Sequence, residues 1–151
     1  MKVIAKNRRA FHDYEIIERI TAGISLLGHE VKSVRAGQIS LKGSFVHFQN
    51  HEAYLVNAHI RRYSHAANLK EHDPTRSRKL LLHRKQIDNL EAEKRGAGLA
   101  VVPVAVGVEH GLIKVEIALG RGKKHYDKRE ASRKKTMKID AALEAKRRLN
   151  T

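Results

Sequence analysis

The chain has 151 residues and a formal charge of +15, with 31 lysine and arginine residues against 16 aspartate and glutamate residues. This length suits one domain, and a hydrophobic fraction of 41% is enough for one core of moderate size. The absence of cysteine excludes disulfides, thiolate nucleophiles and cysteine-based zinc sites. The longest apolar run covers about ten residues, whereas a membrane span needs about 20, and no signal peptide is visible. We therefore expect a cytoplasmic protein with no membrane partner that binds a polyanion.

The first half of the chain predicts short strands and one short helix. A strand is expected over residues 14–27, in which Gly23 indicates a bulge or a bend. A helix is expected over residues 29–36. Residues 44–48 and 52–60 predict a hairpin. The side chains expected on one face of its second strand are Tyr54, Val56, Ala58 and Ile60.

Residues 73–96 predict one long helix. Asp73 can cap free backbone N–H groups, Pro74 suits the first helical position, and Gly96 suits the end. Leu80, Ile87 and Leu90 would share its apolar face. Its first half holds five cations, which form either a solvated face or a surface for phosphates. They are Arg76, Arg78, Lys79, Arg84 and Lys85.

Two further strands are expected near the end of the domain. Residues 99–106 are apolar on both faces, and Pro103 predicts an edge or a bulge there. Residues 112–119 alternate, with isoleucine, valine and leucine on the inner face, after a turn at His110 and Gly111. Residues 61–72 read as a loop. The predicted fold is mainly β: a small closed oligonucleotide-binding-type barrel with accessory helices and a basic C-terminal tail.

The positive charge divides almost equally between two regions. Residues 1–122, the predicted RNA-binding barrel domain, carry a net +8, and the tail of residues 123–151 carries a net +7. Such a tail is either a solvated extension or an arm that becomes ordered on nucleic acid.

Recognisable catalytic chemistry is missing from the sequence. The ten histidines form no HExxH pair, and the residues around Gly122 and Lys123 do not complete a phosphate-binding loop. We therefore expect no enzyme, no metal and no cofactor. Aromatic residues make up only 5% of the chain, which leaves few platforms for stacking unpaired bases and favours a folded RNA read by its shape and phosphates.

Several segments, in order and over nearly the whole chain, resemble one known family. They include Glu30-Val31-Lys32-Ser33, the run from Asp73 to His83, and the run from Gly122 to Arg129. Together they resemble the SsrA-binding protein family, also called small protein B. Thr21 stands where this family usually has a glutamate associated with RNA binding, so a carboxylate role is lost at that position.

The resemblance implies a function. The family binds the tRNA-like domain of transfer-messenger RNA (tmRNA) and carries it to the A site of ribosomes stalled on messages that lack a stop codon, in trans-translation. The expected partners are tmRNA, the ribosome and its small-subunit rRNA, with elongation factor Tu and alanyl-tRNA synthetase associated through the RNA. The protein itself is expected to be a monomer.

The resemblance also implies roles for individual residues. The RNA-binding residues expected in the domain are Asn7, Arg8, Arg9, Lys32, Arg35, Arg76, Arg78 and Lys79. Those expected at the junction and in the tail are Gly122, Lys123, Lys124, Tyr126, Asp127, Lys128, Arg129, Arg133, Lys134 and Lys135. Tyr126 is expected near the decoding centre, where it either stacks on a ribosomal base or packs on the end of the barrel. The tail is expected to be disordered when free and helical in the empty mRNA channel.

Composition alone leaves two other functions open. One is a ribosomal protein or ribosome assembly factor that stays on rRNA. The other is a basic DNA-binding protein, although no helix-turn-helix with a separate recognition helix is visible.

Overall fold

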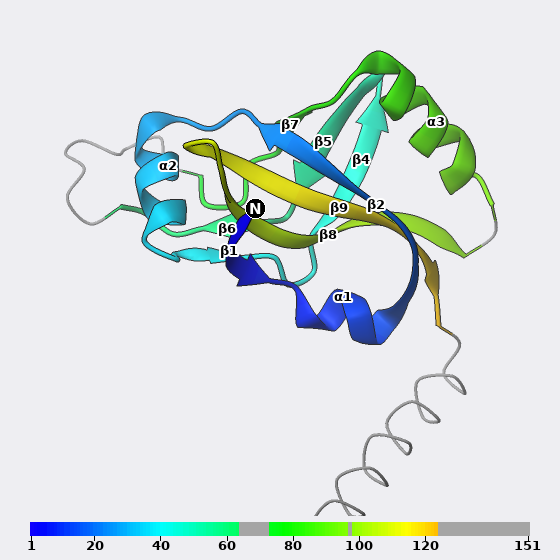
Figure 1. The fold of residues 1–151 in the computed structure, drawn as a ribbon, viewed down its shortest axis with the longest axis horizontal. Helices are drawn as coiled ribbons and strands as arrows, with labels where there is room; N and C mark the ends of the chain where they lie inside the picture. Colours follow the sequence, from blue (N-terminus) through cyan, green and yellow to red (C-terminus); the bar gives the residue numbers. More distant parts are fainter. Residues whose placement is uncertain (64–72, 97, 124–151) are drawn as a thin grey trace, which may run out of the picture.

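The computed structural model describes residues 1–63, 73–96 and 98–123, which form mainly antiparallel strands with short helices at their margins (Figure 1). The strands are β1 (Lys2–Lys6), β2 (Tyr14–Ile24), β3 (Ile39–Ser40), β4 (Phe45–Gln49), β5 (Glu52–Val56), β6 (His59–Ile60), β7 (Arg78–Leu81), β8 (Leu99–Glu109) and β9 (Leu112–Gly122). The helices are α1 (Arg8–Asp13), α2 (Gly28–Arg35) and α3 (Arg84–Lys94). Apart from Lys123, the predicted tail lies outside the described residues.

Seven strands form one sheet in the order β1-β8-β9-β2-β7-β5-β4, and β3 pairs separately with β6. The mainly β fold with accessory helices is therefore confirmed. The hydrogen-bonded order does not return from β4 to β1. The closed barrel expected from the sequence is therefore not formed by strand pairing among the described residues, although β4 lies close to β8.

The long β8–β9 hairpin forms the centre of the fold, as the alternating pattern predicted. Ile113, Val115 and Ile117 are buried along β9. The turn residues His110 and Gly111 have φ angles of 51° and 75°, which suit a tight two-residue hairpin turn. The strand pairing shifts between Pro103 and Ala105, which confirms the predicted bulge. However, β8 pairs on both sides and is not an edge strand.

The predicted helix over residues 73–96 is wrong in its first half. Asp73 instead closes a turn by accepting a hydrogen bond of 3.0 Å from the Thr75 backbone N–H, and β7 follows. Because β7 pairs with both β2 and β5, its side chains alternate: Arg78 and Leu80 point inward, and Lys79 and Leu81 point outward. The helix α3 begins only at Arg84. Tertiary pairing has therefore overridden the local helical pattern.

Two local predictions for the other strands are corrected. The bulge in β2 lies between Ile16 and Glu18 and not at Gly23. Gly23 is instead a point of close approach, because a Cβ atom there would lie 3.1 Å from the Leu81 Cβ. The other correction concerns the second hairpin strand, where Ala53 and Leu55 face the core.

Tyr54 and Val56 are only partly buried, so they do not share the buried face with Ala58 and Ile60, and the prediction of one common face is wrong. Asn57 adopts a φ of 65° and breaks the alternation, after which Ala58 and Ile60 return to the core as predicted. The hairpin itself and the short helix α2 are confirmed.

Candidate nucleic-acid interface

Asn7 fixes the start of α1 and is buried within the fold. Its side chain is 6% exposed, and its amide group donates hydrogen bonds to the Leu41 carbonyl at 3.2 Å and the Pro103 carbonyl at 2.9 Å. Its side-chain oxygen also accepts from the Ala10 backbone N–H, which caps the helix. Every polar side-chain atom of Asn7 thus has a partner within the fold, so Asn7 positions α1, and the RNA contact expected of it stays a prediction.

The helix that Asn7 positions exposes a basic concavity, here called the α1 hollow. Arg8 and Arg9 are both exposed, and a depression of 740 Å³ opens beside them. The other polar residues that line it include Lys6, His12, Asp13, Ser40 and Lys42. Asp13 is the acidic member, and it pairs with Arg9 at 3.4 Å. Since four lysine and arginine residues face this one carboxylate, the hollow suits a phosphate backbone.

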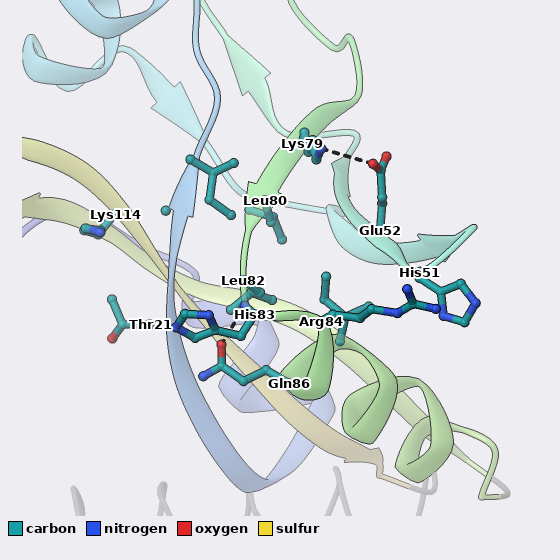
Figure 2. A pocket seen from close by; sticks show the side chains of 13 residues that line it. Thr21, His51, Glu52, Lys79, Leu80, Leu82, His83, Arg84, Gln86 and Lys114 are labelled. Carbon is teal, nitrogen blue, oxygen red and sulfur yellow. Dashed lines mark hydrogen bonds and ion pairs between the residues drawn. The ribbon is translucent and has the colours of Figure 1, made fainter.

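A second basic concavity, here called the β7 groove, lies between β2, β7 and the start of α3 (Figure 2). It has a volume of 590 Å³, and its polar lining residues include Thr21, His51, Glu52, Lys79, His83, Arg84, Gln86 and Lys114. The His83 backbone N–H donates to the Gln86 side chain at 3.0 Å, which fixes the first turn of α3 against the groove.

Glu52 is the acidic member of the β7 groove, and it is already partnered. The Tyr54 hydroxyl donates to it. Lys79 also pairs with it at 3.1 Å, as Figure 2 shows. These two hydrogen bonds lower the pKa of the Glu52 carboxyl group below its ordinary value. Lys79 is therefore exposed but partly neutralised, whereas no ion pair within the described residues involves Lys114.

Arg78 is buried and forms the centre of an ionic network under α2. Its side chain is 0% exposed and pairs with Glu30 of α2 at 2.7 Å. Its other N–H groups donate to the carbonyl groups of Ala58 at 2.8 Å and Pro74 at 3.0 Å. The guanidinium group of Arg78 therefore joins β7 to α2 and to the chain before β6, and the RNA contact expected at Arg78 stays a prediction.

Arg76 belongs to the same network but reaches the surface. Its guanidinium group pairs with Glu30, and its side chain is 32% exposed. Burial acts to raise the pKa of Glu30, but hydrogen bonds from Arg76, the Leu27 backbone and Arg78 outweigh it and hold the pKa below its ordinary value. Glu30 thus remains an anion between two arginines.

The two α2 residues expected to bind RNA are both exposed. The Lys32 ammonium group lies 5.7 Å from the centroid of the Tyr63 ring. Arg35 donates a hydrogen bond of 2.8 Å to the Gly111 carbonyl group and so holds the turn of the β8–β9 hairpin. These residues lie at the opposite end of the sheet from the end of β9 (Figure 1).

The junction with the tail is anchored where the described residues end. The Gly122 backbone N–H donates to the Gly98 carbonyl at 2.7 Å, and the Lys123 backbone N–H donates to the Asp13 carbonyl at 2.9 Å. The Lys123 ammonium group also donates to the Phe11 carbonyl at 3.3 Å. Lys124, Tyr126 and the other expected tail residues lie outside the described residues.

Comparison with known proteins decides the family. The family model described as "SmpB protein" matches residues 4–147 of this chain. The chain belongs to the SmpB family. It is 48% identical to the "SsrA-binding protein" of Shouchella clausii over 148 residues, which cover 98% of this chain and 94% of that protein. It is 52% identical to the "SsrA-binding protein" of Sulfurihydrogenibium sp. over 137 residues, with 91% and 90% covered.

A solved structure supports the same family. Its description reads "tmRNA-SmpB: a journey to the center of the bacterial ribosome", and its chain is 43% identical to this one with a TM-score of 0.69. The match covers 85% of this chain and 94% of that chain. The SmpB fold expected from the sequence motifs is thus supported by both sequence and structure.

Sequence reasoning missed part of this SmpB surface. Lys6 and Lys42 line the α1 hollow, and Lys114 lines the β7 groove, but none of them had been selected. A usable signal exists for Lys114, because it alternates along β9 with the inward side chains of Ile113 and Val115. No comparable signal marks Lys6 and Lys42, because the hollow is assembled from three separate elements.

The described residues contain neither a metal-binding cluster nor a helix that could cross a membrane. Within residues 1–63, 73–96 and 98–123, no group of three or more histidine, aspartate or glutamate side chains is arranged to hold a metal ion. No helix in this part of the chain is long and apolar enough to cross a membrane.

Proposed function

We propose that this chain is an RNA-binding adaptor of trans-translation. It binds the tRNA-like domain of tmRNA and delivers it to the A site of stalled ribosomes. The observation that carries the proposal is the family match over nearly the whole chain, and a solved SmpB relative is described together with tmRNA and the ribosome. The α1 hollow and the β7 groove supply exposed cations suited to a phosphate backbone.

The proposal extends to partners and place of action. Elongation factor Tu and alanyl-tRNA synthetase meet the protein through the RNA, and the protein acts as a monomer in the cytoplasm. It has no enzymatic step of its own. The domain of residues 1–122 holds the RNA cargo, and the tail of residues 123–151 tests whether the mRNA channel is empty. A basic helix can enter that anionic channel only when mRNA is absent.

Co-purification of RNA tests the function directly. The tagged protein is purified without nuclease, and the bound RNA is sequenced. Enrichment of one long RNA with a tRNA-like domain is expected. Predominance of ribosomal RNA would instead favour a ribosomal protein or assembly factor, and predominance of genomic DNA would favour a DNA-binding protein.

Truncation tests the division of labour between domain and tail. A chain that ends after Gly122 keeps the net +8 of the domain and should retain most of its affinity for the tRNA-like RNA. Peptide tagging on stalled ribosomes should collapse. If RNA binding fell in proportion to tagging, the proposed division between domain and tail would be wrong. Unchanged tagging would contradict it as well.

A further inference from the structure

The outer face of α2 and the chain that follows β6 form a third basic surface, here called the α2 patch. It contains the exposed cations Lys32, Arg35, Arg61 and Arg62. Lys32 and Arg35 are three residues apart and therefore lie on one face of the helix. The Arg61 backbone N–H donates to the Gln38 carbonyl at 2.9 Å, which brings the segment after β6 alongside the end of α2.

The charges of this patch are not balanced within the described structure. None of the four cations takes part in an ion pair among the described residues. Glu30 is the one acidic residue of α2. Its side chain is 1% exposed and forms ion pairs with Arg76 and Arg78. The exposed face of the helix is therefore positive. Arginine is also the side chain best suited to bidentate contact with phosphate.

The patch is held in place before any ligand binds. Gln38 anchors the segment after β6 through its carbonyl group, and its own backbone N–H donates to the Ser33 carbonyl of α2 at 2.9 Å. Arg35 is tied to Gly111, and the Lys32 ammonium group rests over the Tyr63 ring. Because the surface is already ordered, little conformational entropy is lost when it meets a polyanion.

The patch lies far from the point where the described domain ends. The β9 strand runs from Leu112, beside the turn that Arg35 holds, to Gly122 at the junction with the tail (Figure 1). Eleven residues of β-strand span roughly 35 Å. The patch is therefore well separated from Gly122, where the described domain ends, so the patch and the tail can hold different polyanions. This favours the RNA cargo over ribosomal RNA as its occupant.

We propose that the α2 patch binds the sugar–phosphate backbone of the RNA cargo, with Arg61 and Arg62 as contacts additional to the α1 hollow and the β7 groove. This inference rests on the proposed function, since it names a further surface for the same RNA. The contact is sequence-independent, and it adds affinity that weakens as salt rises.

A matched pair of double variants tests the proposal in the full chain. Arg61→Ser with Arg62→Ser removes two charges from the patch, whereas Arg95→Ser with Arg121→Ser removes two charges from exposed positions elsewhere. Affinity for the isolated tRNA-like RNA domain is measured from about 50 mM to about 200 mM salt. Two lost phosphate contacts should make the ratio of wild-type to variant affinity fall roughly tenfold over this range. The control variant should keep the salt dependence of the wild type.

A single substitution and a comparison RNA complete the test. Lys32→Gln should shift the salt dependence in the same direction and by about half as much, with unchanged thermal unfolding. If both double variants lost the same amount of salt dependence, net charge alone would explain the effect, and the proposed contact at the α2 patch would be wrong. A wild-type salt dependence in the Arg61/Arg62 variant would overturn it as well. If wild-type protein does not prefer the tRNA-like RNA to an unrelated hairpin of equal length, the proposed function fails together with this inference.

Discussion

The region under α2 and the α1 hollow both contain arginines that the sequence predicts to bind RNA, yet the structure places these arginines differently. Under α2, Arg78 is 0% exposed and bound to Glu30, whereas in the α1 hollow Arg8 and Arg9 stand at the surface. The difference follows from backbone geometry, because Arg78 occupies an inward position of a strand and the other two lie on the outer turn of a helix. Residue type and motif therefore do not reveal whether an arginine is already paired within the fold. Burial and pairing show this directly.

The largest expected effect is the loss of stability when the ionic network under α2 is broken. Glu30→Gln removes the anion between Arg76 and Arg78 and leaves a buried guanidinium group without its charge partner. Breaking a buried pair in this way costs about 3–5 kcal/mol of the free energy of unfolding. Denaturant unfolding measures this loss. A loss below about 1 kcal/mol would mean that the network contributes little, as is usual for exposed pairs.

Acid should weaken the same region. The pKa of Glu30 in the folded protein lies below its ordinary value of 4.5, so its stabilising contribution is complete above that value. The contribution is lost as the pH falls through the lower, folded pKa. Between about pH 5 and pH 3, the free energy of unfolding should therefore fall more steeply in the wild type than in Glu30→Gln. Parallel curves for the two proteins would contradict the assignment.

A smaller loss of stability is expected at α1, where Asn7 positions the helix and the exposed arginines are expected to contact RNA. Asn7→Ala removes the helix cap and two buried hydrogen bonds, so it should lower the free energy of unfolding by about 2–3 kcal/mol. The comparison variant, Arg8→Ser with Arg9→Ser, should change stability by less than about 1 kcal/mol and reduce the salt dependence of RNA binding. If the double arginine variant were the less stable of the two, the contrast between the regions would fail.

The smallest expected effect compares two lysines of the β7 groove. Lys79 is already paired with Glu52, whereas no ion pair of the described residues involves Lys114. Lys114→Gln should therefore weaken RNA binding more than Lys79→Gln, by about threefold to tenfold in the dissociation constant, because one phosphate contact of roughly 1 kcal/mol is lost. Titration of both variants with the tRNA-like RNA at one salt concentration measures the difference. Equal losses would show that the pairing of Lys79 does not reduce its contact with RNA.

Local patterns predicted the parts of the fold that depend on neighbouring residues. The alternation along β9, the turn at Gly111 and the helix α2 follow from side-chain period and turn chemistry. The sequence predicts a helix in place of β7 because Leu80 stands at a helical spacing from Ile87 and Leu90 of α3. Its pairing with β2 and β5 depends on residues far away in the chain, and no local pattern reports them.

The site was predictable to a similar extent. Exposed Arg8, Arg9 and Lys79 were selected, but buried Asn7 and Arg78 were selected with them. Burial of Arg78 depends on Glu30, which lies 48 residues earlier in the chain. A sequence pattern identifies charged residues, whereas only the assembled fold shows which of them are already neutralised.

The double pairing of β9 has a consequence for how this chain can vary. The strand is hydrogen-bonded to β2 on one edge and to β8 on the other. Inserting or deleting one residue within it would turn every later inward side chain outward. Homologous chains should therefore change length in their turns and termini while this strand keeps its residue count. The number of residues between the turn at Gly111 and the tail junction should therefore be constant among homologous chains.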